Sequence, residues 1–71
     1  SVLPTINVKK QFIEKCLRGS PIFEVFLENK EDKKNFREND KLCIFSDNTF
    51  IGCYSFKDKK DLIAVPEFVY N

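Results

Sequence analysis

Residues 41–56 read KLCIFSDNTFIGCYSF and carry the clearest structural signal in the sequence. Two runs rich in β-branched and aromatic residues, 41–46 and 49–56, flank Asp47 and Asn48, which tolerate the positive φ angles of a tight turn. The stretch therefore predicts a β-hairpin. Gly52 lies inside the second run, where glycine weakens packing, so it indicates a bulge, a bend or a close approach of two backbones.

Upstream of the hairpin, apolar residues recur at helical spacing. They are Val8, Phe12, Ile13, Cys16 and Leu17. Asn7 is placed to cap the first turn of this helix, and Gly19 is placed to close the last turn in a left-handed conformation before Ser20 and Pro21 end it. We predict one main helix between Asn7 and Gly19.

The other segments follow from composition and punctuation. We expect an extended lead-in or short strand over Ser1–Val8, a strand over Ile22–Leu27, a charged loop over Glu28–Lys41 with one helical turn that pins Phe36 to the core, a charged turn over Lys57–Asp61, and one or two strands over Leu62–Tyr70 with a bulge or edge at Pro66. The predicted class is α+β and β-rich, with one main helix on a small sheet or barrel.

Composition excludes several classes of protein. The chain has 71 residues, of which 42% are hydrophobic and 32% are charged, with a net charge of +1. No apolar run approaches the roughly 20 residues of a membrane-spanning helix, so no membrane partner is expected. The chain has no histidine, and its turn carboxylates lie among lysines, so neither a nucleophile–histidine pair nor a carboxylate with a raised pKa is expected. We predict no catalysis within this chain, and no cofactor or metal.

The chain contains three cysteines, Cys16, Cys43 and Cys53. None of their spacings is that of a zinc site, and the odd number argues against a disulfide framework. A strict two-residue hairpin loop places Cys43 opposite Gly52, whereas one added residue places it opposite Cys53. We expect three reduced thiols buried in the core as small hydrophobic groups, which suits the cytoplasm.

Exposed positive charge is the remaining functional signal. The predicted helix carries Lys9, Lys10, Lys15 and Arg18 on its solvent face, and the later turn carries Lys57, Lys59 and Lys60. Such side chains bind phosphates, but they also serve as plain solubilising charges or contact a protein partner. Composition alone does not separate these functions.

Residues 42–54 and 62–70 resemble the C-terminal PUA-like domain of bacterial TruB-type tRNA pseudouridine synthases. The family pattern is an alternating hydrophobic strand, an Asp-containing turn, Phe-Leu-Gly, a charged turn, then Leu, a Pro and a short aromatic-aliphatic strand, and Phe50-Ile51-Gly52 stands at the Phe-Leu-Gly position here. The opening Leu3-Pro4, the helix and the Arg18-Gly19-Ser20-Pro21 turn are also similar, so the resemblance runs from Leu3 to Tyr70. Cys43, Thr49 and the charged segment 28–41 depart from that pattern.

The resemblance implies a small PUA-like pseudobarrel and a single RNA-binding domain over residues 1–71, excised from the C-terminal end of a larger cytoplasmic enzyme. Catalysis in that family belongs to a separate domain with a Gly-x-Leu-Asp motif, which this chain lacks. The implied function is to dock the tRNA acceptor arm, as a monomer, while the catalytic domain of the parent chain isomerises the T-loop uridine. The implied RNA-binding residues are Lys9, Lys10, Lys15, Arg18, Gly19, Ser20, Pro66 and Phe68. Two alternatives are a PUA-like module of another RNA-modifying or ribosome-associated protein, and a structural or protein-interaction domain.

Overall fold

The predicted hairpin forms the centre of the molecule in a computed structural model that describes residues 4–70. Strand β3 (Lys41–Ser46) pairs antiparallel with β4 (Thr49–Lys59), and Ser46 faces Thr49 across a two-residue loop. Both loop residues have positive φ, 51° at Asp47 and 66° at Asn48. The prediction from the turn chemistry is therefore confirmed.

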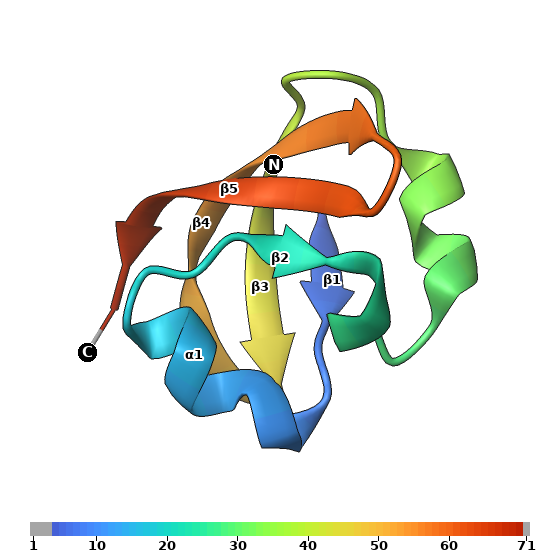
Figure 1. The fold of residues 1–71 in the computed structure, drawn as a ribbon. Helices are drawn as coiled ribbons and strands as arrows, with labels where there is room; N and C mark the ends of the chain where they lie inside the picture. Colours follow the sequence, from blue (N-terminus) through green and yellow to red (C-terminus); the bar gives the residue numbers. More distant parts are fainter. Residues whose placement is uncertain (1–3, 71) are drawn as a thin grey trace.

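Three further strands extend the hairpin into a five-stranded sheet of order β1-β3-β4-β5-β2. Strand β1 (Thr5–Asn7) runs parallel to β3, and β5 (Leu62–Val69) runs antiparallel to β4. The short β2 (Ile22–Phe23) pairs with the start of β5. The sheet curls, so that β5 and β2 cross in front of β3 (Figure 1). The α+β, β-rich class is confirmed, and residues 62–69 form one strand.

The main helix is shorter than its apolar stripe predicts. A 3-10 turn, η1 (Lys10–Phe12), leads into α1 (Ile13–Leu17), and Asn7 belongs to β1 and caps no helix. Val8 was predicted to lie in the helix because of its spacing, but its backbone forms an antiparallel bridge with Leu27. That bridge lies in extended chain, so the helix begins only after it.

The segment predicted as a strand over Ile22–Leu27 is mostly not a strand. Only Ile22 and Phe23 pair with β5, and the chain then tightens into a 3-10 turn, η2 (Glu24–Phe26). This turn buries Phe26, whose ring stacks on Phe12 with centroids 4.1 Å apart. Packing of one aromatic ring thus overrides the strand propensity of the segment.

The charged segment between η2 and β3 follows the prediction of a loop that pins Phe36 to the core. It contains the 3-10 helix η3 (Lys30–Asn35), after which the ring of Phe36 stacks on Phe56 at 5.5 Å and packs against the core. The charged turn near residue 60 is smaller than predicted, because β4 continues to Lys59.

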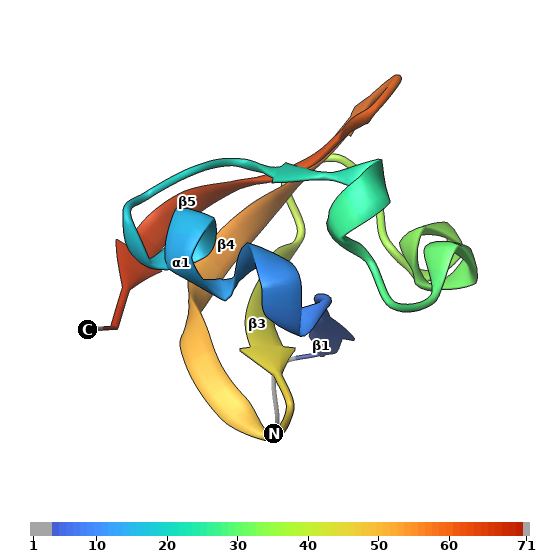
Figure 2. The ribbon, with the colours of Figure 1, turned by 60° about the horizontal axis from the view of Figure 1, so that its bottom comes forward.

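The core lies inside the curled sheet, and η1 and α1 lie across the end where β3 finishes (Figures 1 and 2). Cys16 is the fully buried residue of α1, and the Tyr54 hydroxyl donates to its carbonyl at 3.5 Å. The buried Ser46 hydroxyl donates to the carbonyl of Val8 at 2.8 Å. These two bonds fix the helix and its lead-in to the hairpin. Among residues 4–70, no helix is long and apolar enough to cross a membrane.

Two irregularities shape the C-terminal part of the sheet. A Cβ atom at Gly52 would lie 2.2 Å from the carbonyl oxygen of Phe68, so the two backbones approach as closely as only glycine allows. The pairing of β4 with β5 shifts between Tyr54↔Pro66 and Cys53↔Phe68, which leaves Glu67 as an extra residue. The expectations for Gly52 and Pro66 are therefore both confirmed.

Candidate nucleic-acid interface

In the turn that ends α1, the backbone amides donate hydrogen bonds to the helix, and within residues 4–70 no other atoms cover the outer side of Gly19. The amide of Ser20 donates to the carbonyl of Lys15 at 3.1 Å and that of Gly19 to Cys16 at 3.0 Å, a Schellman arrangement. Gly19 has φ of 93°, as predicted, and a Cβ added there would meet nothing within 4 Å. The carbonyls of Lys15 and Cys16 thus accept hydrogen bonds from the turn, and the side of Gly19 on which a Cβ atom would stand is open.

The segment after this turn lies beside β5. Ile22 pairs with Ala64 of β5 in antiparallel register, so the residues before Ile22 continue toward the later part of β5. Figures 1 and 2 both show the connection from α1 to β2 running along β5. The Ser20 hydroxyl donates to the carbonyl of Pro21, its own neighbour, at 2.9 Å. Arg18, Gly19, Ser20 and Pro66, which the family resemblance selects, therefore lie on one edge of the barrel.

Positive charge on this edge is largely uncompensated. Lys9, Lys15 and Arg18 are exposed, and within the described residues none of them forms an ion pair. Lys10 is held by Asp47 at 3.3 Å, in a pair so exposed that its contribution to stability is small. Lys9 lies at the other end of the helical segment, directly before η1, so we call Lys15, Arg18, Gly19, Ser20 and Pro66 the basic edge.

The last residue that the resemblance selects, Phe68, lies elsewhere. It pairs with Cys53 across β5 and β4, on the face of the sheet that points away from the core, and is 54% exposed. Pro66 pairs instead with the buried Tyr54. The bulge at Glu67 therefore separates Pro66 on the core side of β5 from Phe68 on the outer side.

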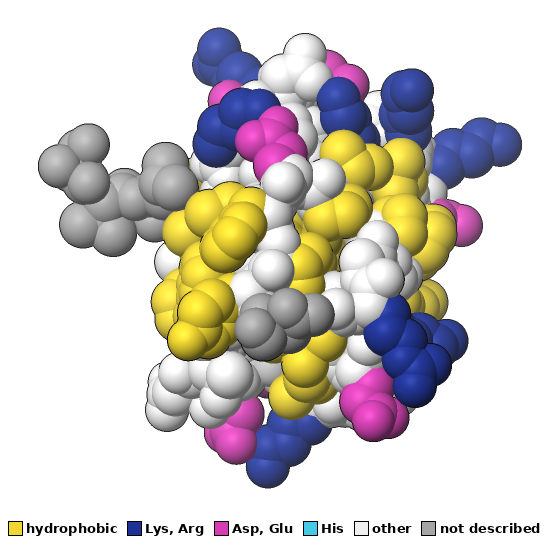
Figure 3. All heavy atoms as spheres, turned by 90° about the vertical axis from the view of Figure 1, so that its left-hand side faces the viewer, with side chains coloured by type: hydrophobic (Ala, Val, Ile, Leu, Met, Phe, Trp, Pro, Cys, Tyr) yellow, Lys and Arg dark blue, Asp and Glu magenta, His cyan; other side chains and the backbone are white. Residues whose placement is uncertain are grey.

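Phe68 belongs to a larger apolar surface that sequence reasoning missed. The outer sheet face, as we call it, consists of Cys43, Phe45, Phe50, Cys53, Phe68 and Tyr70. The rings of Phe45 and Phe50 contact each other at 5.5 Å, and Phe50 contacts Tyr70 at 6.1 Å. Seen from the side where β5 ends, hydrophobic side chains form broad patches with Lys and Arg around them (Figure 3).

A signal for this surface exists in β3 itself. Leu42, Ile44 and Ser46 point into the core, while the alternate residues Cys43 and Phe45 are also apolar. A strand that is apolar on both faces normally lies inside a protein. Here the second face is partly exposed, so the same pattern marks a surface with apolar character.

The three cysteines divide into one buried and two accessible thiols. Cys16 is fully buried as predicted, and burial raises its pKa from 9.0 to about 11. The prediction that Cys43 and Cys53 are also buried is wrong, because their side chains are half-exposed on the outer sheet face. The register shift after Ile44 places Cys43 opposite Cys53 although the hairpin loop has only two residues.

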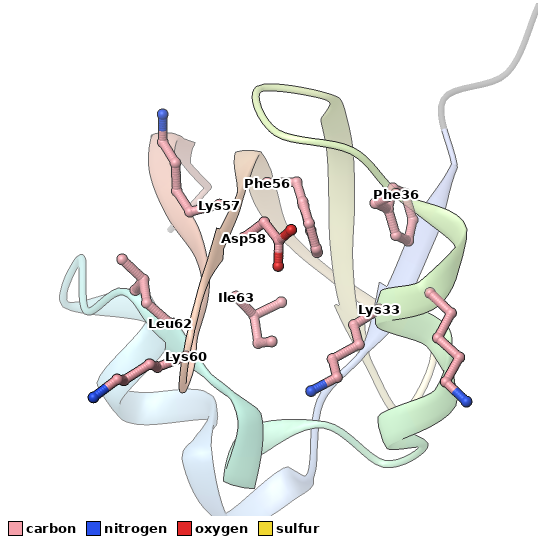
Figure 4. A pocket seen from close by; sticks show the side chains of 9 residues that line it. Lys33, Phe36, Phe56, Lys57, Asp58, Lys60, Leu62 and Ile63 are labelled. Atoms are coloured by element: carbon pink, nitrogen blue, oxygen red, sulfur yellow. The ribbon is translucent and has the colours of Figure 1, made fainter.

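A second group of lysines, Lys57, Lys59 and Lys60, lies near the end of β4. This group, which we call the alternative basic cluster, is less suited to bind anions than the basic edge. It borders a cavity of about 230 Å³ between η3 and the β4–β5 turn. In Figure 4 the Asp58 carboxylate points into this cavity, whereas Lys57 and Lys60 point away from it. Lys57 donates to Asn39 at 2.7 Å and pairs with Glu38, and Lys33 donates to Glu24 at 2.8 Å, which holds the pKa of Glu24 below its usual value. Lys57 and Lys33 therefore already have anionic partners, whereas Lys59 and Lys60 form no ion pair within the described residues.

In the described part of the chain, no three His, Cys, Asp or Glu side chains come together as metal ligands. No polar side-chain atom buried among residues 4–70 lacks a hydrogen-bond partner either.

Comparison with solved structures identifies the architecture. The chain superimposes on a conserved PUA domain protein from Thermoplasma acidophilum with a TM-score of 0.76 and 16% sequence identity, over 96% of this chain and 48% of the other. The fold is a PUA-like pseudobarrel. This chain thus spans about half the length of that protein. No protein-family model and no curated protein matches the sequence.

Proposed function

We propose that this PUA-like domain binds structured RNA through the basic edge. The observation that carries the proposal is that Lys15 and Arg18, which form no ion pair among residues 4–70, lie beside an open glycine turn on a PUA-like barrel. Lysine and arginine supply sequence-independent phosphate contacts, and a glycine backbone lets the sugar–phosphate chain approach closely.

The more specific form of the proposal is that the RNA is the acceptor arm of tRNA. In this form the domain is the C-terminal accessory module of a cytoplasmic, TruB-type pseudouridine synthase, and the catalytic domain of the parent chain isomerises the T-loop uridine. Support comes from the sequence resemblance over residues 42–54 and 62–70 together with the PUA-like fold. Helical RNA is recognised by shape, phosphates and 2′-hydroxyls, so a small patch with few base contacts is adequate.

Phe68 extends the proposed interface from the basic edge onto the outer sheet face. Its ring is exposed and free to stack on an unpaired base, an interaction that tolerates any sequence. The paired stem would then contact Lys15, Arg18 and Gly19, and an adjoining single-stranded end would reach Phe68 around the bulge at Glu67.

The test is a fluorescence titration of the domain with labelled tRNA and with an unstructured RNA of equal length, each at two salt concentrations. We expect tighter binding to tRNA that weakens as salt rises. The double variant Lys15→Ala/Arg18→Ala should weaken binding at least tenfold and lower the salt slope by roughly 2, one for each lost phosphate contact. Equal binding of both RNAs, or an unchanged salt slope, would contradict the proposal.

A matched control variant is Lys30→Ala/Lys59→Ala. These lysines are also exposed and have no ion pair within the described residues, so the control removes the same net charge from elsewhere on the surface. The control should bind tRNA nearly as well as the unchanged domain. If both double variants lose the same affinity, net charge rather than the basic edge determines binding.

A protein-interaction function is the second candidate, because the outer sheet face exposes Phe68 and Tyr70 at 54% and 62%. Exposed aromatic residues are enriched at protein interfaces. Preference for another structured RNA over tRNA in the same titration would instead favour a different RNA-modifying or ribosome-associated parent protein. Absence of RNA binding, with the fold intact by circular dichroism, would shift the assignment to the protein-interaction function.

A further inference from the structure

Two accessible thiols face each other in the middle of the outer sheet face. Cys43 on β3 and Cys53 on β4 are direct partners in the antiparallel register. The pairing shifts from Ile44↔Gly52 to Phe45↔Phe50, so Ile51 is an extra residue in β4. The amide of Tyr70 donates to the carbonyl of Ile51 at 2.8 Å, and this long-range bond holds the bulge that brings the two cysteines opposite each other.

The backbone geometry at this pair suits a disulfide. Directly opposed residues of antiparallel strands have Cα atoms about 4.5 to 5.5 Å apart, inside the range of roughly 4.4 to 6.8 Å that a disulfide requires. Side chains of opposed residues also leave the same face of the sheet. Burial raises the pKa of Cys43 above its ordinary value, and the neighbouring Cys53 thiol raises it further.

Accessibility separates this pair from the third cysteine. Cys43 and Cys53 are half-exposed, whereas Cys16 is fully buried on α1 against the core side of Tyr54. A small oxidant in solution reaches the outer sheet face without any opening of the fold. Oxidation should therefore be selective for the pair.

We propose that Cys43 and Cys53 form a reversible intramolecular disulfide by exchange with a low-molecular-weight disulfide such as oxidised glutathione. One cysteine loses its proton, and its thiolate attacks a glutathione sulfur, which forms a mixed disulfide and releases one glutathione thiolate. The second cysteine, also as thiolate, attacks the protein sulfur of that mixed disulfide and releases the second glutathione thiolate. The two cysteines are oxidised by two electrons, the glutathione disulfide is reduced to two glutathione molecules, and these take up the two protons.

The disulfide would lock the β3–β4 pairing beside Phe45, Phe50 and Phe68. A bond across the hairpin restricts the unfolded chain, so the oxidised domain should unfold at a higher temperature than the reduced domain. This property does not depend on RNA binding, and each can fail without the other.

The experiment treats the reduced domain with oxidised glutathione, removes the reagent and counts thiols in denaturant with Ellman's reagent. We expect the count to fall from three to one, the intact mass to drop by two hydrogen atoms, and peptide mapping to join Cys43 to Cys53. The product should run as a monomer on a non-reducing gel, and dithiothreitol should restore all three thiols.

Single variants Cys43→Ser and Cys53→Ser serve as controls, since each removes one partner with a nearly isosteric hydroxyl. Each should stop at a mixed disulfide that carries one glutathione, with Cys16 still reduced. Two separate glutathione adducts on the unchanged domain, a disulfide that includes Cys16, covalent dimers, or three remaining thiols after prolonged treatment would each overturn the proposal. Circular dichroism before and after treatment checks that the reacting species is folded.

Discussion

The basic edge and the outer sheet face occupy the same small barrel but handle charge in opposite ways. On the basic edge, Lys15 and Arg18 are exposed without ion-pair partners among the described residues. On the outer sheet face, Lys41 is neutralised by an ion pair with Glu67, and the surrounding surface is aromatic. The proposed RNA-binding surface thus differs from the outer sheet face in its uncompensated positive charge, although the net charge of the whole chain is only +1.

The largest expected effect on the free energy of unfolding comes from substitution of the two glycines. Gly52→Ala drives a Cβ to within 2.2 Å of the Phe68 carbonyl oxygen, so β4 and β5 must separate, and we expect a loss of about 3 kcal/mol or more in the free energy of unfolding. Gly19→Ala meets open space and only has to adopt a φ of 93°, so it should cost about 1 kcal/mol. Urea denaturation measures both, and an equal loss for the two variants would contradict the account.

The stability of the fold at alkaline pH tests the contact between Tyr54 and Cys16, which holds α1 and the basic edge in place. Burial raises the pKa of Tyr54 from 10.0 to about 12, with a further rise from the charge of Cys16, whose own pKa is raised to about 11. The folded state thus keeps protons that the unfolded chain releases. Stability is full below about pH 9 and is lost as pH rises toward 12, by on the order of 3 kcal/mol at pH 11.

Thermal denaturation from about pH 8.5 to pH 11 measures this loss. Tyr54→Phe keeps the ring and removes the hydroxyl, so the remaining pH dependence should be the part that comes from Cys16. A pH-independent unfolding temperature over that range would show that neither group titrates differently in the folded state.

Phe68→Ala tests whether the outer sheet face contributes to RNA binding. Loss of one stacked base should weaken tRNA binding by about 1 to 3 kcal/mol while the salt slope stays unchanged, because stacking releases no counterions. Lys15→Ala/Arg18→Ala should instead change the slope. Val25→Ala is the matched control, since Val25 is an apolar side chain that is 56% exposed on η2. Equal losses for Phe68→Ala and Val25→Ala would remove Phe68 from the interface.

The smallest effect is expected at the ion pair of the outer sheet face. Lys41→Ala, Glu67→Ala and the double variant should each change the free energy of unfolding by less than about 1 kcal/mol, because both side chains are well exposed to water. Lys41→Ala should also leave tRNA affinity unchanged, although it removes a positive charge. A loss of affinity as large as that of Lys15→Ala would contradict the distinction between paired and unpaired lysines.

Features set by local chemistry could be predicted from the sequence. The hairpin turn depends on Asp47 and Asn48 accepting positive φ, and the end of the helix depends on Gly19 doing the same. Phe36 follows a charged segment as the lone apolar residue, so its role in pinning that segment was also predictable. For the hairpin turn and the end of the helix, the decisive interactions lie within a few residues of Asp47, Asn48 and Gly19.

Features set by long-range pairing could not be predicted. Val8 has helical spacing with Phe12, but it bridges Leu27, which lies far along the chain. The pairing of Cys43 with Cys53 depends on a bulge at Ile51, which is held by the amide of Tyr70. The outer sheet face could not be predicted for a related reason. Apolar residues on both faces of a strand normally indicate burial, and the sequence does not show that the second face of β3 is partly exposed.

The most direct test of the central claim is to map the RNA contact on the ¹⁵N-labelled domain by chemical-shift perturbation with a tRNA acceptor-arm hairpin. We expect the amides of Lys15–Ser20 and of residues 65–68 to shift or broaden on RNA binding and to recover as salt is added. Perturbations confined to the β4–β5 turn and η3, around the alternative basic cluster, would contradict the account and move the RNA site away from the basic edge.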